Sequence, residues 1–213
     1  MQLIKPSIEF IWCTEKPLQT IESAGRTCYK SGLKINDTSA IEFVKMLIKQ
    51  GHEAMLEHAS ASYRFICDRG VTHEIVRHRL FSYAQESTRY CNYKGGVTFI
   101  IPCWLQNEII ETENFQLRRQ FEQTPSDNWL YIMCRTEEKY QELIAKGWTP
   151  QQARSVLPNA LKTEIVITGN LREWRHFFKL RCAKAAHPQM QEVANMALAD
   201  IQKRIPIIFE EIK

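Results

Sequence analysis

Apolar residues follow two different spacings in this chain, and the order of these spacings limits the folds open to it. Residues 60–67 carry apolar or aromatic side chains at every second position, which is the period of a β-strand. Residues 38–51 instead carry apolar side chains three or four positions apart, as in an amphipathic helix. Segments of the two kinds do not alternate regularly, so nothing requires a parallel sheet. We predict an α+β fold with a mainly antiparallel sheet flanked by helices.

The same patterns give bounds for the remaining elements. Strands are expected at residues 8–14, 60–67, 97–101 and 163–168. Helices are expected at residues 17–29, 38–50, 71–76, 126–146, 149–157 and 188–204, with a further basic helix after Gly169-Asn170. Residues 107–123 could form a helix or a variable insertion. We see no repeat, low-complexity segment or linker, and we therefore expect a single domain over residues 1–213.

Two of these helices carry more specific expectations. In the helix at 38–50, Asp37-Thr38 is the expected cap, and the buried face is expected to contain Ile41, Val44, Leu47 and Ile48. In the helix at 126–146, Ser126 and Asp127 are the expected cap.

The bulk composition is that of an ordinary globular protein. Hydrophobic residues make up 44% and charged residues 24% of the 213 positions, and the net charge is +4. This mild positive charge suits an anionic ligand but does not demand nucleic acid. No apolar run is long enough to cross a bilayer, and the first residues lack the pattern of a signal peptide. We expect a cytoplasmic protein with no membrane partner.

The cysteines do not indicate a disulfide framework or a metal centre. There are seven of them, an odd number, and no two have the C-x-x-C spacing. The interpretation we favour is that they are small buried hydrophobic residues in a reducing compartment. His52 and His58 also stand too far apart to bind one metal ion from the same helix, so no metal is expected.

Residues 77–89 concentrate the groups that bind phosphate. Within these thirteen residues lie three arginines and the hydroxyl pair Ser87-Thr88. Arginine presents a planar fork of donors that matches phosphate oxygens, and backbone amides beside hydroxyl residues can add neutral donors. The alternative is a solvated basic surface, because short basic runs are common.

The neighbouring segments favour a ligand site over a solvated surface. We expect the helix at 71–76 to continue far enough that Ile75 and Arg79, and likewise Glu74 and His78, lie one turn apart. Residues 82–85 show neither helical nor strand periodicity, so they are expected to form an irregular loop. A fixed helix end that opens into a polar loop is a common place for ligands.

The spacing of this stretch resembles the motif of the flavin-dependent thymidylate synthases, in which R-H-R is followed after seven residues by S-x-R. Here the motif is Arg77-His78-Arg79 and Ser87-Thr88-Arg89, and the resemblance extends from about Ala24 to the last helix. It implies reductive methylation of dUMP to dTMP, with methylenetetrahydrofolate as the carbon donor and FAD, reduced by NADPH, as the hydride donor. It also implies a homotetramer with sites shared between subunits and no nucleic-acid partner.

The resemblance implies roles for individual positions. The expected FAD-binding residues are Ala54, Arg77, His78, Arg79, Gln85, Asn170, Leu171, Arg172 and His176. The expected dUMP-binding residues are Glu74, Arg77, Gln85, Glu86, Ser87, Thr88, Arg89, Arg154 and Arg181. Arg181 is the expected catalytic residue, which would stabilise charge on ring nitrogen 3 of the uracil as carbon 5 becomes nucleophilic.

Two positions depart from the family pattern, and one helix allows a check. Ala54 stands where many relatives have a hydroxyl residue, and Glu86 stands where an apolar residue is frequent, so Glu86 is expected to point away from a phosphate. On the basic helix, Arg172 and His176 share a face, whereas Arg181 lies about 180° away from Arg172. One helix could therefore serve two ligands.

Two other interpretations remain open at this point. Pro102-Cys103 matches the dipeptide of the cysteine-dependent thymidylate synthases, although Trp104 follows where those enzymes have histidine. A nucleic-acid-binding module could use the same arginines beside stacking platforms formed by Tyr83, Tyr90 and Tyr93.

Overall fold

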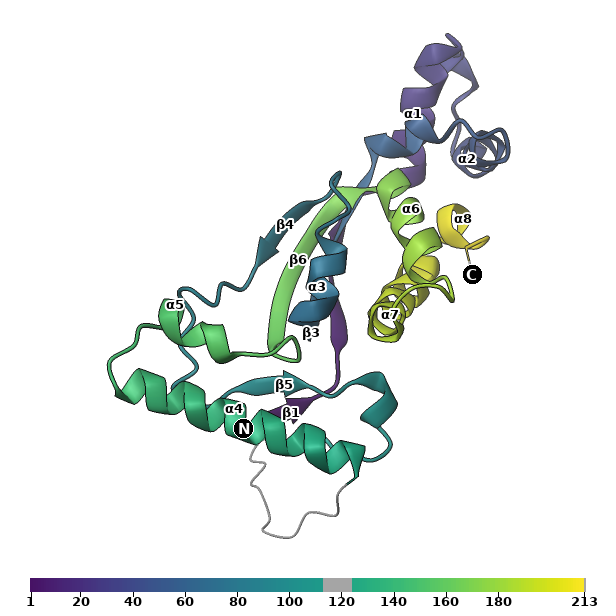
Figure 1. Cartoon of the computed structure of the whole chain (residues 1–213). Coiled ribbons are helices and arrows are strands. Elements are labelled where there is room, and N and C mark those ends of the chain that lie inside the picture. The colour runs from purple at the N-terminus through teal and green to yellow at the C-terminus, as the bar shows by residue number, and fades with distance from the viewer. Residues whose placement is uncertain (113–123, 213) are drawn as a thin grey trace. The chain divides into compact units, whose positions relative to one another are not determined.

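The structure, a computed structural model, describes residues 1–112 and 124–212 (Figure 1). In chain order its elements are β1 (Gln2–Ile4), β2 (Ser7–Cys13), α1 (Pro17–Cys28), η1 (Gly32–Lys34), α2 (Ser39–Lys49), η2 (Glu53–His58), β3 (Ser60–Asp68), α3 (Arg69–Ile75), β4 (Ser82–Gln85), β5 (Thr98–Ile100), η3 (Cys103–Leu105), α4 (Pro125–Ala145), α5 (Pro150–Ala153), η4 (Arg154–Val156), β6 (Lys162–Asn170), α6 (Leu171–Arg181), α7 (Pro188–Arg204) and α8 (Pro206–Phe209), where η marks a short 3-10 helix.

The elements form a four-stranded antiparallel sheet of order β2-β3-β6-β4 and a two-stranded parallel sheet of β1 and β5. This mixture of helices and a mainly antiparallel sheet confirms the predicted α+β class. The chain groups into two compact units: unit 1 comprises Met1–Ser7, Ile66–Ile75 and Gln85–Ile165, and unit 2 comprises Ile8–Phe65, Val76–Ala84 and Val166–Lys213. The expectation of one domain stays a prediction.

An aromatic cluster fixes α6 within unit 2. The Trp174 ring lies 5.4 Å from that of Tyr63 and stacks at 6.4 Å on that of Phe65, both from β3. The indole N–H of Trp174 donates to the backbone oxygen of Ala61 at 3.1 Å. All three rings are fully buried, and burial of each contributes on the order of 2 kcal/mol to folding. This packing holds the side chains of α6 in fixed positions.

Unit 1 has its own hydrophobic core. Leu3 of β1 pairs with Phe99 of β5, and both are buried together with Met133 and Tyr140 of α4. Thr124 caps α4 by accepting from the backbone N–H of Asp127 at 3.1 Å, while the Asp127 carboxylate accepts from Thr124. The predicted cap at Ser126-Asp127 is therefore wrong by two residues, because Pro125 occupies the first helical position.

The segment between α3 and β4 differs from the prediction in two ways. Helix α3 ends at Ile75, so Arg79 does not lie one helical turn beyond it, nor His78 one turn beyond Glu74. The His78 carbonyl instead accepts from the backbone N–H of Phe81 at 3.1 Å, which closes a turn. Residues 82–85, predicted to be an irregular loop, form strand β4 beside β6. Pairing with a strand eighty residues away supplies the backbone hydrogen bonds that local periodicity could not reveal.

Two smaller expectations are also corrected. The buried face of α2 consists of Ala40, Phe43, Val44 and Leu47. Of the residues that the sequence placed on that face, Ile41 is exposed and Ile48 is half-buried. All seven cysteines are free, but only Cys67 is buried. The interpretation of residues 107–123 lies largely outside the described residues. Among the helices that the structure describes, none is both long and apolar enough to span a bilayer.

Candidate active site

In unit 1 the segment after β4 folds into a turn that presents two guanidinium groups to solvent. The Ser87 carbonyl accepts from the backbone N–H groups of Tyr90 and Cys91, at 3.1 and 2.9 Å. Arg154, from η4, donates to the Thr88 hydroxyl at 3.2 Å. Thr88 is buried, whereas Arg89 and Arg154 are exposed. The structure thus brings together the hydroxyls and arginines that the sequence assigned to the dUMP phosphate.

The other predicted dUMP residues of unit 1 are held by protein groups. Glu86 accepts from the Tyr93 hydroxyl at 2.6 Å and pairs with Lys162 at 3.2 Å. Its carboxylate is therefore held by protein groups, although Lys162 also pairs with Glu164, at 2.6 Å. Burial, together with the hydrogen bond to Glu86, raises the pKa of Tyr93. Gln85 donates to the hydroxyl of Thr72 at 3.0 Å. Glu74 is half-buried on α3.

In unit 2 the R-H-R segment meets α6. Asn170 caps this helix by accepting from the backbone N–H of Glu173 at 2.8 Å, and the Leu171 N–H donates to Ala59. Arg181, at the other end of the helix, donates its Nε–H to Nε2 of His78 at 2.9 Å. Two predicted ligand-binding segments, 103 residues apart in sequence, are thus joined by one hydrogen bond.

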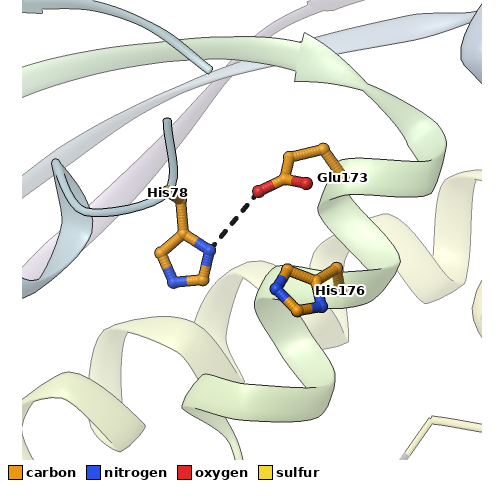
Figure 2. Close-up of side chains that lie close together, drawn as sticks. All are labelled: His78, Glu173 and His176. Carbon is orange, nitrogen blue, oxygen red and sulfur yellow. Dashed lines mark ion pairs between the residues drawn. The ribbon is translucent and has the colours of Figure 1, made fainter. Parts of the chain in front are cut away.

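The pKa of His78 is strongly lowered in this site. The residue is 5% exposed, and its Nδ1 lies 3.5 Å from an oxygen of Glu173, as Figure 2 shows. Burial lowers the pKa of His78 to about 4, helped by the positive charge of Arg181 and by His176. Burial also raises the pKa of Glu173. His78 is therefore a neutral imidazole near pH 7.

A pocket of about 480 Å³ lies beside this cluster. Eight residues line it: Glu53, Glu57, Leu80, Asn170, Arg172, Glu173, His176 and Lys179. Three of them are predicted FAD residues, and their amide, guanidinium and imidazole groups suit the phosphates and ring edges of a flavin nucleotide. Arg172 is ion-paired with Glu57 at the rim. The donor groups of the pocket fit the implied cofactor, and three carboxylates share the lining with them.

Other predicted FAD residues lie elsewhere. Ala54 lines a separate apolar pocket of about 260 Å³ with Met55, Leu47 and Tyr29, so the structure does not group it with Asn170, Arg172 and His176. Arg77 and Arg79 are exposed in the turn on either side of His78. The two arginines of α6 have different partners, Glu57 for Arg172 and His78 for Arg181, and the idea that this helix serves two ligands stays a prediction.

Sequence reasoning missed one acidic member of this site. Glu173 was assigned no role, yet it faces His78 and lines the pocket together with Glu53 and Glu57. Glu173 lies midway between Asn170 and His176, three residues from each, and this spacing was the signal that could have identified it.

The stacking platforms expected of a nucleic-acid module are mostly engaged inside the protein. Tyr83 donates its hydroxyl to the His78 carbonyl at 2.6 Å, and the Tyr93 ring packs at 5.9 Å on Tyr140. Only Tyr90, of the three tyrosines in question, has an exposed ring, which lies beside Arg89.

An α+β fold with an arginine- and hydroxyl-rich turn, and with a polar pocket beside a neutral histidine, has the features expected of a nucleotide-binding protein. Residues 9–207 match the family described as "Thymidylate synthase complementing protein". The chain is 37% identical over 203 residues to a flavin-dependent thymidylate synthase of Corynebacterium efficiens, covering 91% of this chain and 78% of the relative. It is 35% identical over 201 residues to the protein of the same name from Pyrococcus furiosus, covering 90% and 77%. The chain belongs to this family, which confirms the resemblance stated above.

A solved structure has the same fold. The UMP/dUMP methylase PolB of Streptomyces cacaoi, bound with 5-Br dUMP, superposes with a TM-score of 0.78 at 23% identity, over 99% of this chain and 96% of that one. At this identity the likeness establishes the shared fold.

Proposed function

We propose that this protein is a flavin-dependent thymidylate synthase that converts dUMP to dTMP. Its carbon donor is methylenetetrahydrofolate, and it works as a homotetramer. The observation that carries the proposal is the hydrogen bond from Arg181 to His78, which joins the R-H-R segment to α6 inside one compact unit. Membership in the family supports the same conclusion.

The residues of unit 1 hold the nucleotide by its phosphate. Arg89 and Arg154 supply exposed guanidinium groups, and Ser87 and Thr88 supply hydroxyls, so that a dianion meets both charged and neutral donors. Gln85 and Glu74 are proposed to contact the remainder of dUMP. Glu86 is held by Lys162 and Tyr93, and its carboxylate is proposed to point away from the phosphate.

The residues of unit 2 orient the cofactor and activate the uracil. Asn170, Leu171, Arg172 and His176, with Arg77 and Arg79, are proposed to hold FAD, which when bound and reduced by NADPH supplies the hydride. Arg181 stabilises the negative charge that develops on ring nitrogen 3, because a fixed cation lowers the barrier to an anionic transition state. His78 stays neutral at the working pH, so it holds Arg181 without competing for that negative charge.

The test is direct. The purified protein, incubated with FAD, NADPH, methylenetetrahydrofolate and dUMP, should be yellow and should form dTMP, which chromatography detects. Light scattering should give the mass of a tetramer. A colourless protein that does not take up added FAD, or one that forms no dTMP under these conditions, would sink the proposal.

A further inference from the structure

The hydrogen-bonding state of His78 follows from its partners. The Nε of arginine carries a hydrogen and can only donate, so Nε2 of His78, 2.9 Å from it, must accept and be unprotonated. In a neutral imidazole the single proton then resides on Nδ1. That nitrogen faces Oε1 of Glu173 at 3.5 Å (Figure 2), and Glu173 is only 7% exposed.

We propose that Glu173 is a positioning residue that accepts the Nδ1 proton of His78 and thereby keeps Nε2 available to orient Arg181. The inference deepens the proposed function, on which it rests. Glu173 acts through two contacts in series: it selects the tautomer of His78, and His78 fixes the Nε edge of the Arg181 guanidinium. An acceptor oxygen at residue 173 suffices for this role, and a charge is not required.

The ring of His78 is held independently of Glu173. Phe177 and Phe81 pack against it at centroid distances of 5.0 and 6.3 Å, and the Tyr83 hydroxyl binds its backbone carbonyl. Removal of the Glu173 carboxylate should therefore leave the imidazole in place, while the proton is no longer fixed on Nδ1. Without an acceptor for Nδ1–H, the proton can move to Nε2, where it would oppose Arg181.

A metal site is the competing interpretation of the same cluster. The nearest ligand atoms of His78, Glu173 and His176 all lie within 4.8 Å of one another, close enough to surround a divalent ion. However, Nδ1 carries the proton and Nε2 already accepts from Arg181, so His78 offers no lone pair. A metal ion would have to displace either the hydrogen bond from Arg181 or the Nδ1 proton that faces Glu173, which makes metal binding an outcome for the test to exclude.

The experiment compares Glu173→Met, which has no acceptor, with Glu173→Gln, whose amide oxygen can accept from Nδ1–H. Phe178→Leu is the matched control, because this buried α6 side chain packs on Trp174 and Phe209. FAD uptake is measured by absorbance, dUMP affinity by calorimetry on the FAD-loaded protein, and dTMP formation in a single turnover. Each variant is also made in the Arg181→Ala background.

We expect Glu173→Met to bind FAD normally while its dUMP affinity and turnover fall roughly ten- to a hundredfold, the usual cost of an unmade buried hydrogen bond. Glu173→Gln should stay within about threefold of the wild type, and Phe178→Leu should keep both values. Because Glu173 acts through Arg181, Glu173→Met should change dUMP affinity by less than about twofold in the Arg181→Ala background.

The outcomes separate the inference from the proposed function. A wild-type protein that forms no dTMP would sink the proposed function. With an active wild type, the inference alone is overturned if Glu173→Met has unchanged dUMP affinity, loses FAD, or is additive with Arg181→Ala. It is also overturned if Glu173→Gln loses as much as Glu173→Met, a result that remains available if the Met variant does not fold. Stoichiometric Zn²⁺ binding that Glu173→Gln abolishes would establish the metal site instead.

Discussion

The two cation-bearing regions of this protein differ in how they treat charge. In unit 1, Arg89 and Arg154 are exposed and stand beside hydroxyl groups, so their charge is available to an anion from solvent. In unit 2, Arg181 donates to a buried neutral histidine. Water and salt screen the charges of Arg89 and Arg154, whereas the contact between Arg181 and the buried His78 is screened far less. The comparison teaches that the first region is built for affinity and the second for orientation.

The largest expected effect tests the orienting role of Arg181. Lys179 and Lys184 lie near it in sequence, so bulk positive charge would survive Arg181→Ala, but a planar donor group in a fixed position would be lost. We expect yellow, FAD-loaded protein whose dTMP formation falls roughly a hundredfold or more, with weaker dUMP binding. Arg181→Lys should recover little of this activity. Absorbance and single-turnover product formation provide the measurements.

Arg172→Ala is the control for this prediction, because Arg172 lies on the same helix and pairs with Glu57 at the pocket. Its largest defect should be in FAD binding, with a smaller effect on dUMP binding. If Arg181→Ala turns over normally at saturating dUMP, or loses flavin while Arg172→Ala retains it, the division of α6 between two ligands is wrong.

A smaller effect is expected for the exposed arginines. Arg154→Ala removes one charge-assisted contact to the phosphate, so dUMP binding should weaken roughly tenfold to thirtyfold. Binding of deoxyuridine, which has no phosphate, should be unchanged, and the difference between the two ligands should shrink as salt is added. Calorimetry with both ligands at low and high ionic strength measures this. An equal loss of affinity for deoxyuridine would show that Arg154 does not read the phosphate.

These two regions also mark what the sequence could and could not predict. The R-H-R and S-x-R segments were identified through their family resemblance, and a basic helix was predicted after Gly169-Asn170, where α6 lies. The contact between Arg181 and His78 spans 103 residues and depends on packing, so no local pattern contains it. Glu173 was missed for the same reason, because its role is defined by a partner on another segment.

The fold shows the same limit. Strand β3 was predicted from its alternation, since a half-buried strand repeats every two residues whatever lies beside it. Strand β4 was missed because its four residues carry no such alternation and form a strand only through β6. Ile41 was placed in the core of α2 on spacing alone. The buried face contains Phe43 instead, because the elements that pack against α2 determine which side of the helix is covered.

A third prediction uses the acid stability of the buried histidine. The pKa of His78 is lowered from 6.5 to about 4 in the folded protein, so the unfolded chain binds more protons between these values. The contribution of neutral His78 to the free energy of unfolding is therefore fully present above pH 6.5, and it is lost as the pH falls toward 4. Glu173, whose pKa is raised, acts in the opposite direction. With both groups taken together, acidification should lower the free energy of unfolding by about 1 to 2 kcal/mol.

His78→Gln provides the comparison, since it retains an acceptor for Arg181 and does not titrate. Urea unfolding of both proteins at pH 7.5 and pH 4.5 gives the free energies. The wild type should lose more stability than His78→Gln on acidification. Equal losses would show that His78 is not held neutral by its surroundings, and the contrast with the solvated cations of unit 1 would disappear.

The smallest effect is expected at Cys103, whose substitution tests whether the reaction needs a cysteine nucleophile. Its thiol is half-buried at the start of η3 in unit 1, and the flavin route requires no cysteine nucleophile. A thiolate mechanism would need that sulfur to add to the uracil, so its removal would abolish turnover. Cys103→Ala should therefore form dTMP within about twofold of the wild-type rate, as a substitution outside the site normally does.

Cys91 is another half-buried cysteine of unit 1, so Cys91→Ala is the matched control and should behave in the same way. Complete loss of turnover in a folded, FAD-loaded Cys103→Ala protein, with Cys91→Ala active, would restore the thiolate mechanism and leave Arg181 as a binding residue only.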